Sequence, residues 1–339
     1  MSHSDIDEFQ SFIRFNYNKK HIFSIEKTVL NWQHKSTEYY HYMIAKKDGK
    51  IVGIHGVIPM SQYDESLPTN QIFPALWKVN EKEGIAIGLR LFKAVLDKYK
   101  PELTINSGID PRLISFHKSQ GFYVSKMDHY VIFSPFVDSY NIAINVPRID
   151  YKEHCENTLL VTKKLTINDF VEYNFDKLYS QRIPTKSNSY IINRYFKHPI
   201  YDYDVFGIFK NNIVIAICVI RRVVVGRSSV LRLVDYIGDD KSFSLLNSFF
   251  IRLLKESNAE YCDFYVYGIP ENIIIKAGFV NRKLINSLIV PNYFEPIKRI
   301  NIDILFGIRT LNDISLVRFF KGDGDQDRPS QLSRKGEYE

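Results

Sequence analysis

Residues 79–89 read Val79-Asn80-Glu81-Lys82-Glu83-Gly84-Ile85-Ala86-Ile87-Gly88-Leu89, and this stretch joins an apolar run to an amphipathic run. An apolar run before it (residues 72–79) predicts a strand, and an amphipathic run that continues to residue 99 predicts a helix beginning inside it. Small residues at positions 84, 86 and 88 would let backbone N–H groups approach a ligand. Because a helix N-terminus adds unpaired donors and a positive dipole end, the stretch predicts a pocket for a phosphate or pyrophosphate.

Two common phosphate loops are excluded by the order of these residues. A Walker loop ends in Gly-Lys-Ser/Thr, whereas Gly88 is followed by Leu89 and Arg90. The dinucleotide fingerprint Gly-x-Gly-x-x-Gly is absent, since Gly84 and Gly88 are four positions apart with Ala86 between them.

A second informative segment follows the predicted helix. Residues 103–108 predict a short strand, and residues 110–122 predict a short helix. Asp110 is suited to cap that helix, Pro111 to occupy its first position and Gly121 to end it.

Together the two segments resemble the signatures of the GNAT N-acyltransferase superfamily. Residues 81–86 are similar to its coenzyme A pyrophosphate loop, Gln/Arg-x-x-Gly-x-Gly/Ala, with Glu81 where Gln or Arg is usual. Residues 117–122 are similar to its Tyr-x-x-x-Gly-Phe segment, with His117 in the place of the tyrosine. The order of the two segments also matches, so the resemblance implies a GNAT fold for the first half and coenzyme A as co-substrate.

The second half of the chain repeats this plan. Hairpins are predicted at 39–59 and 204–225, and each is followed by a strand, a helix, a strand and a short helix ending in Gly-Phe. Gly278-Phe279 therefore mirrors Gly121-Phe122. The second predicted helix, over 241–257, follows Asp239 and Asp240, whose charges would repel pyrophosphate.

These patterns predict an α+β fold with two GNAT-like domains in tandem, each a mixed, mostly antiparallel sheet flanked by helices. We expect a domain with the acyl-CoA loop at 1–150 and a degenerate GNAT-like domain that shapes the acceptor site at 151–320. Residues 321–339 would form a C-terminal tail, flexible from residue 330 onward.

Composition and charge set further limits. The 339 residues are 45% apolar, enough for two cores, and no apolar run approaches the length of a membrane span. The sequence has no signal-peptide pattern, so we expect a cytoplasmic protein. Its three cysteines (Cys155, Cys218 and Cys262) are widely separated, so we expect no disulfide framework and no metal site. The net charge of +7 favours anionic partners. Nucleic-acid signatures are absent, so we expect neither a nucleic-acid nor a membrane partner, and coenzyme A and nucleotide sugars fit the charge.

Among tandem-GNAT proteins, the chain resembles the N-acyltransferases of bacterial surface-polysaccharide biosynthesis. The segments that carry this likeness are residues 31–33, 194–201 and 322–329. The resemblance implies transfer of an acyl group, with acetyl the first to test, from acyl-CoA to the amino group of a nucleotide-linked amino-deoxysugar.

Candidate site residues follow from the motifs and the resemblance. We expect coenzyme A to contact Trp77, Val79, Gly84, Ile85, Ala86, Ile87, Gly88, Leu89, Asn106 and Ser107. For proton transfer we single out His117, Asp110 and Glu81. For the acceptor we single out Arg194, His198, Tyr201, Asp327 and Arg328. Each of these residues also has a structural interpretation, as a packed histidine, a solvated carboxylate or a helix cap. A further alternative is that the protein uses no general base and accelerates the reaction by orienting the two substrates.

Two other functions remain open at this point. One is a tRNA-dependent peptidoglycan-bridge aminoacyltransferase, and the other is a non-catalytic protein that binds acyl-CoA or a nucleotide. A calcium loop in the Asp-rich segment is disfavoured, because the twelfth position counted from Asp323 is Arg334 instead of the required glutamate.

Overall fold

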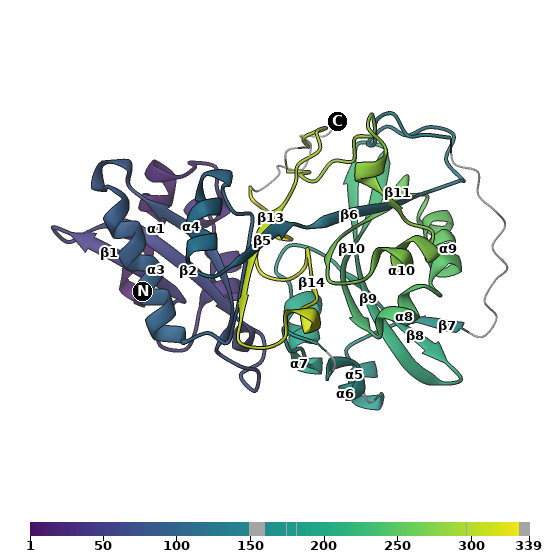
Figure 1. Ribbon diagram of the computed structural model, residues 1–339, viewed down its shortest axis with the longest axis horizontal. Coiled ribbons are helices and arrows are strands. Elements are labelled where there is room, and N and C mark those ends of the chain that lie inside the picture. The colour runs from purple at the N-terminus through teal and green to yellow at the C-terminus, as the bar shows by residue number, and fades with distance from the viewer. Residues whose placement is uncertain (149–159, 174, 181, 296, 332–339) are drawn as a thin grey trace.

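The computed structural model describes residues 1–148, 160–173, 175–180, 182–295 and 297–331. Two mixed sheets flanked by helices make up an α+β molecule, which confirms the predicted fold class (Figure 1). Cys155, the predicted boundary at residue 150 and the last eight residues of the predicted tail lie outside the described residues. In the described part of the chain, every helix is too short or too polar to span a bilayer.

The first sheet has the strand order β1-β2-β3-β4-β13-β5. Its strands are β1 (Tyr42–Lys47), β2 (Lys50–Pro59), β3 (Gln71–Val79), β4 (Leu103–Ser107), β5 (Tyr123–Lys126) and β13 (Leu305–Thr310). Its helices are α1 (Ile6–Asn16), α2 (Thr28–His34), α3 (Ile85–Tyr99) and α4 (Ile114–Ser119). The predicted first hairpin, the strand before the loop and the helix after it are all present.

Helices cover both faces of this sheet because strand side chains alternate between the faces. Ile54 of β2 packs in one core with Phe9 of α1, and Val57 of the same strand packs in another core with Val95 of α3. Along α3 the buried residues recur every three or four positions (Gly88, Leu91, Phe92, Val95 and Tyr99), which is the stripe that the sequence predicts.

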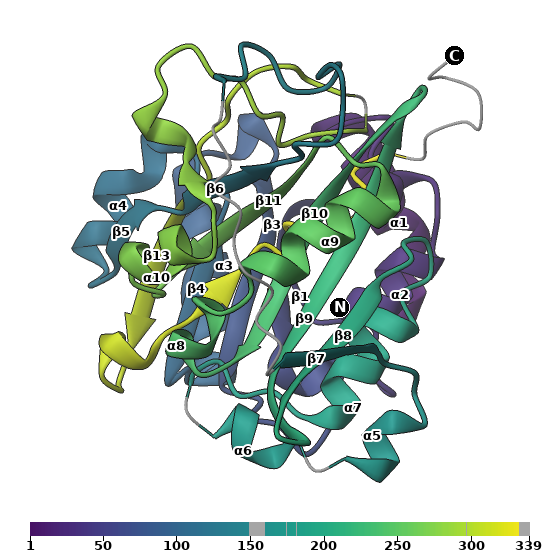
Figure 2. The ribbon, with the colours of Figure 1, turned by 90° about the vertical axis from the view of Figure 1, so that its right-hand side faces the viewer.

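The second sheet has the order β12-β6-β11-β10-β9-β8-β7, with β14 paired to β11. Its strands are β6 (Asp128–Phe133), β7 (Leu160–Lys164), β8 (Asp204–Lys210), β9 (Ile213–Val225), β10 (Ser228–Gly238), β11 (Tyr261–Tyr267), β12 (Val280–Asn281) and β14 (Phe319–Phe320). The helices of this half are α5 (Asp169–Glu172), α6 (Asp176–Tyr179), α7 (Asn188–Ile191), α8 (Asp240–Phe243), α9 (Asn247–Ser257) and α10 (Glu271–Lys276). Helix α9 lies across the sheet in Figure 2 and packs Phe250 and Leu254 against it.

The predicted repeat is present, with one correction. The single helix predicted over 241–257 is two helices, α8 and α9, because Ser244 to Leu246 continue in tight turns. The glycines of the two Gly-Phe pairs follow α4 and α10 with φ of 79° at Gly121 and 90° at Gly278, a conformation that favours glycine. Both free cysteines of the described residues, Cys218 and Cys262, are buried core thiols, as predicted.

The two sheets exchange strands. Strand β6 from the first half pairs antiparallel with β11, and β13 from the second half lies between β4 and β5 in the first sheet (Figure 1). One core also spans both sheets, with Phe73 and Ile105 of the first in the same cluster as Val234 and Tyr265 of the second. The strands of each sheet therefore do not all come from one of the two predicted domains. The domain boundaries at residues 150 and 320 stay a prediction.

Candidate functional site

The first sheet opens into a wedge between β3 and β4. These strands are parallel but pair only at Gln71 with Leu103 and Ile72 with Thr104. Beyond Ile72, no described strand pairs with this side of β3. The wedge therefore leaves a row of β3 backbone groups for a ligand that can add as an extended chain.

A bulge in β3 lies within the wedge. Gly56 of β2 faces Ala75 and His55 faces Trp77, so Leu76 is the extra residue. Its φ of 47° is unusual for a leucine and changes the direction of the neighbouring N–H and C=O groups. Strained backbone of this kind is often found at ligand sites.

The N-terminus of α3 lies at the mouth of the wedge. Gly84 is its N-cap residue with φ of 73°, no side chain caps the first turn, and a Cβ there would meet nothing within 4 Å. The backbone donors of this turn are therefore accessible to an anion. Ile85 and Leu89 of the same helix are 79% and 42% exposed and offer an apolar surface beside those donors.

The two acidic residues before Gly84 pair with lysines. Glu83 is held by Lys47 at 3.1 Å, and Glu81 has a 91% exposed side chain 3.6 Å from Lys78. Glu81 does not line the cavity described below, so its proposed catalytic role stays a prediction without geometric support.

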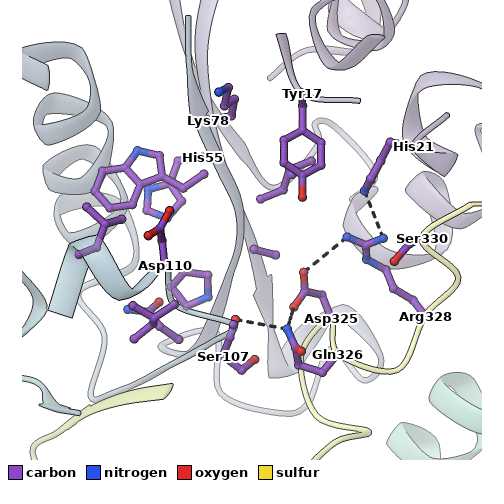
Figure 3. Close-up of a pocket in the computed structure, with 18 of the residues that line it drawn as sticks. Tyr17, His21, His55, Lys78, Ser107, Asp110, Asp325, Gln326, Arg328 and Ser330 are labelled. Atoms are coloured by element: carbon purple, nitrogen blue, oxygen red, sulfur yellow. Dashed lines mark hydrogen bonds and ion pairs between the residues drawn. The ribbon is translucent and has the colours of Figure 1, made fainter. Parts of the chain in front are cut away.

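A cavity of about 1160 Å³ extends from the wedge to residues of the second sheet. Figure 3 shows some of the lining residues near the wedge, among them His55, Ser107 and Asp110. The cavity is lined by these predicted site residues: Trp77, Val79, Gly84, Ile85, Gly88, Leu89, Asn106, Ser107, Asp110, His117, Tyr201 and Arg328. The predicted residues outside its lining are Glu81, Ala86, Ile87, Arg194, His198 and Asp327. The structure thus brings most of the predicted cofactor residues together, and their roles stay predictions.

His117 lies at the inner end of the wedge, where it is 4% exposed. Its Nδ1 is 3.3 Å from the amide nitrogen of Asn106, and its ring packs against Phe92, Phe116 and Phe122. Burial lowers the pKa of His117 to about 4. At neutral pH the ring is therefore uncharged and carries no extra proton that it could supply as an acid.

Asp110 is poorly suited to act as a base. Its carboxylate caps the turn that follows, accepting from the Arg112 N–H at 2.9 Å, and pairs with the Arg112 guanidinium at 2.6 Å. The hydrogen bonds from Arg112 lower the pKa of Asp110 to about 2. Its observed role is that of a helix cap, as its position in the sequence also predicts.

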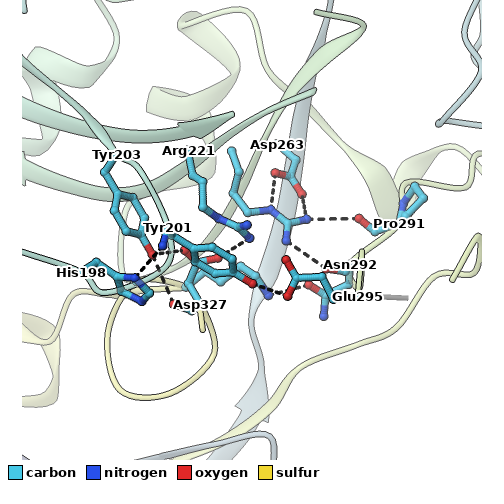
Figure 4. A network of polar contacts seen from close by, with 12 residues as sticks. His198, Tyr201, Tyr203, Arg221, Asp263, Pro291, Asn292, Glu295 and Asp327 are labelled. Carbon is cyan, nitrogen blue, oxygen red and sulfur yellow. Dashed lines mark hydrogen bonds and ion pairs between the residues drawn. The ribbon is translucent and has the colours of Figure 1, made fainter. Parts of the chain in front are cut away.

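Three of the predicted acceptor residues hold a segment of the chain. Arg194, 1% exposed, donates to the Gly322 carbonyl at 2.8 Å. Asp327 accepts from Arg221 at 2.9 Å and from the Tyr203 hydroxyl at 2.8 Å (Figure 4). His198 accepts from two backbone N–H groups through Nδ1. Arg194, His198 and Asp327 make structural contacts and do not line the cavity.

The Asp-rich segment forms one side of the cavity, as Figure 3 shows. Gln326 donates to the Ser107 carbonyl at 3.3 Å, and Arg328 lies 3.5 Å from Asp325 and 3.4 Å from the His21 ring. Asp323, Asp325 and Asp327 each have a different cation as partner, namely Lys186, Arg328 and Arg221. A calcium loop needs several carboxylates that converge on one ion, and these three each pair with a different cation instead.

Sequence reasoning missed several cavity residues. His55 is 2% exposed and stacks on Trp77 at 4.9 Å, and burial lowers its pKa to about 3. Arg221, Arg232 and Lys321 line the end of the cavity that belongs to the second sheet. The signal for the arginines was available, because charged residues inside otherwise apolar strand patterns need buried partners or a ligand.

No family model and no curated protein matches the chain. Solved structures do match. A GCN5-related N-acetyltransferase from Anabaena variabilis is 11% identical with a TM-score of 0.55, covering 92% of this chain and 71% of that one. A probable N-acyltransferase from Enterococcus faecalis is 11% identical with a TM-score of 0.52, covering 93% of this chain and 72% of that one.

The chain has the fold of a GCN5-related N-acetyltransferase. At these identities the likeness is one of fold, and it extends over both halves of the chain. The tandem arrangement predicted from the repeat is therefore confirmed at the level of the fold.

Proposed function

We propose that this protein is an acyl-CoA-dependent N-acyltransferase. The observation that carries the proposal is the open wedge between β3 and β4 with the uncapped N-terminus of α3 at its mouth. The amides after Gly84 would bind the pyrophosphate, and the free edge of β3 would bind the pantetheine arm as an added strand.

In this proposal the bulge at Leu76 positions the thioester. Backbone N–H groups next to it would donate to the thioester oxygen as negative charge develops there. The amine nitrogen attacks the carbonyl carbon, the new C–N bond forms, and the C–S bond breaks. Neutral His117 would accept the proton that the amine loses, and the departing thiolate takes up a proton to give free coenzyme A.

For the acceptor we propose the amino group of a nucleotide-linked amino-deoxysugar. The cavity continues beyond the wedge to polar residues of the second sheet, including Tyr201 and Arg221. Its volume of about 1160 Å³ exceeds that of a typical single-ligand pocket, which supports two substrates bound side by side.

The first test is calorimetric titration with acetyl-CoA, followed by a thymidine-linked 4-amino-4,6-dideoxysugar. We expect each to bind at one site and acyl transfer to occur when both are present. Gly84→Glu should abolish coenzyme A binding, because it places a carboxylate at the proposed pyrophosphate site. Gly49→Glu is the matched control, since Gly49 also has a positive φ and open space around it but lies in the β1–β2 turn.

Each negative outcome has a distinct meaning. Unchanged coenzyme A affinity in Gly84→Glu would remove the loop from the proposal. Coenzyme A binding without turnover of any amino sugar would favour the non-catalytic binding protein. No coenzyme A binding at all would reject the proposal and make charged tRNA the next ligand to test.

A further inference from the structure

A group of buried cations lies at the end of the cavity formed by the second sheet. Figure 4 labels one of them, Arg221, together with its polar neighbours. Arg221 comes from β9, Arg232 from β10, and Lys321 from the residue after β14; their exposed fractions are 7%, 1% and 2%. Asn292, 2% exposed, lies against Lys321. Buried cations in proteins are normally paired, so each partner can be checked in turn.

Each of the two arginines forms an ion pair with a carboxylate. Arg221 pairs with Asp327 at 2.9 Å, and Arg232 makes two hydrogen bonds to Asp263, at 2.9 and 2.7 Å. Arg232 also donates to the carbonyl of Asn292, at 2.9 Å. These two guanidinium charges are therefore balanced within the protein.

Lys321 has no such partner. Its Nζ donates to the Asn292 side-chain oxygen at 2.6 Å, and no carboxylate of the described residues lies within ion-pair distance of it. An ammonium group has three donors, so two remain for another acceptor. Burial, with Arg232 nearby, lowers the pKa of Lys321 to about 7.

In the described part of the chain, two nitrogen donors at this end of the cavity lack an acceptor. The amide nitrogen of Asn292 and the Nε of Arg221 are buried without an acceptor among the described residues. The carboxylate that lines this end, Glu295, already accepts from the Tyr201 hydroxyl, and burial raises its pKa. A surplus of donors calls for a ligand rich in acceptors and negative charge.

We propose that the Lys321 end of the cavity binds the diphosphate of the acceptor substrate. The inference rests on the proposed function and extends it, because it assigns the anionic part of the acceptor to named residues. A diphosphate oxygen would take the two free donors of Lys321 and the amide of Asn292, and the sugar amine would then point toward the wedge. This site is separate from the α3 N-terminus, where the pyrophosphate of coenzyme A is expected.

Titration of thymidine diphosphate in the presence of saturating coenzyme A tests this site. We expect Lys321→Met, which keeps the length of the side chain and removes the charge, to weaken thymidine diphosphate binding about tenfold or more while coenzyme A affinity stays unchanged. Gly84→Glu should show the reverse pattern. Lys241→Met is the matched control, since Lys241 is an exposed lysine of α8 that does not line the cavity.

The outcomes separate the two proposals. Equal thymidine diphosphate affinity in wild type and Lys321→Met, or no binding to wild type, would overturn the diphosphate site. A wild type that binds thymidine diphosphate without binding coenzyme A would instead reject the acyltransferase proposal. Thermal unfolding of each variant identifies any loss of binding that is due to misfolding.

A second test needs no variant. The charged groups at this end of the cavity are Arg221, Arg232, Asp263, Asp327 and Glu295. Burial raises the pKa of Glu295 and lowers the pKa of Lys321 to about 7. We expect thymidine diphosphate affinity to fall at least fivefold between pH 7 and pH 9, with proton uptake on binding at pH 8, because only the ammonium form attracts the anion. An affinity that is flat over this range, with no proton uptake, would overturn the assignment.

Discussion

Between β3 and β4 the first sheet opens into a cavity, whereas the corresponding gap between β10 and β11 is filled by the chain itself. Both gaps follow a short parallel pairing, and both have a bulge in the first strand, at Leu76 in β3 and at Val234 in β10. In the second sheet β14 pairs with β11, and the N–H of Gly322 donates to the Val234 carbonyl at 2.7 Å.

The helix starts beside the two gaps differ in the same way. Gly84 leaves the first turn of α3 accessible, whereas Asp240 in the first turn of α8 pairs with Arg318 at 2.8 Å and with Arg182 at 3.4 Å. The filling segment is held further by Lys186, which lies 2.6 Å from Asp235 and 2.9 Å from Asp323. One supersecondary plan thus gives a binding site where the gap stays open and a packed core where it is filled.

The largest expected effect comes from removing the cation in the filled gap. Lys186→Met leaves Asp235 and Asp323 buried without a counter-charge, so we expect a loss of about 3–5 kcal/mol in the free energy of unfolding. Lys47→Met, beside the open gap, breaks an ion pair whose lysine is 60% exposed and should cost about 1 kcal/mol or less. Urea denaturation measures both, and equal losses would mean that the filled gap is not held by this cluster.

A glycine-to-alanine substitution should change the stability of the protein in opposite directions at the two gaps. A Cβ on Gly322 would lie 2.6 Å from the Tyr195 hydroxyl and 2.7 Å from the Val234 carbonyl, so Gly322→Ala should destabilise by about 2 kcal/mol. At Gly88 the nearest atom would be 3.5 Å away, in Trp77, and Gly88→Ala within α3 should stabilise by about 0.5–1 kcal/mol. Opposite signs in thermal melts would support the comparison, and a tolerated Gly322→Ala would contradict it.

Low pH should reduce the stability of the folded protein through His55, which lines the open gap. Because burial lowers its pKa from about 6.5 to about 3, the folded state keeps His55 neutral while the unfolded state takes up a proton below pH 6.5. Stability therefore falls as the pH drops from 6.5 toward 3. In His55→Gln the loss between pH 7 and pH 5 should be smaller by about 1–2 kcal/mol. Identical pH dependence in the two proteins would show that His55 is not kept neutral by burial.

The smallest effect concerns catalysis. His117→Ala should lower turnover about tenfold, a barrier change of about 1.4 kcal/mol, with coenzyme A affinity retained. The wild-type kcat should stay level down to about pH 5, since the pKa of His117 is about 4. Wild-type turnover in the variant would make His117 a packing residue of the wedge.

Local patterns in the sequence predicted much of this molecule. Alternation, turn residues and the 3.6-residue period located both hairpins, α3 and the two Gly-Phe helix ends, because those features depend on neighbours in the chain. Most of the residues predicted for the cofactor also line the cavity, since Gly84 and Asn106 are placed by adjacent elements.

The missed features depend on residues far apart in the chain. A strand pattern does not encode which edge it will pair with, so β13 between β4 and β5 and β14 beside β11 were not predicted. Contacts between distant residues also decide what Arg194 and Asp327 do: both hold the segment around Gly322, and their roles toward a substrate stay predictions. Lys321 could not be singled out from sequence because its lack of a carboxylate is visible only once the fold is known.

The exchanged strands have a consequence for how the chain folds. Strand β13 pairs Ile308 with Ile105 of β4, two residues about 200 positions apart, and it also supplies the partner of β5. The first sheet is incomplete until residue 310 has left the ribosome, so β5 and one edge of β4 stay unpaired until then. Such high contact order slows folding and leaves strand edges exposed to aggregation in folding intermediates.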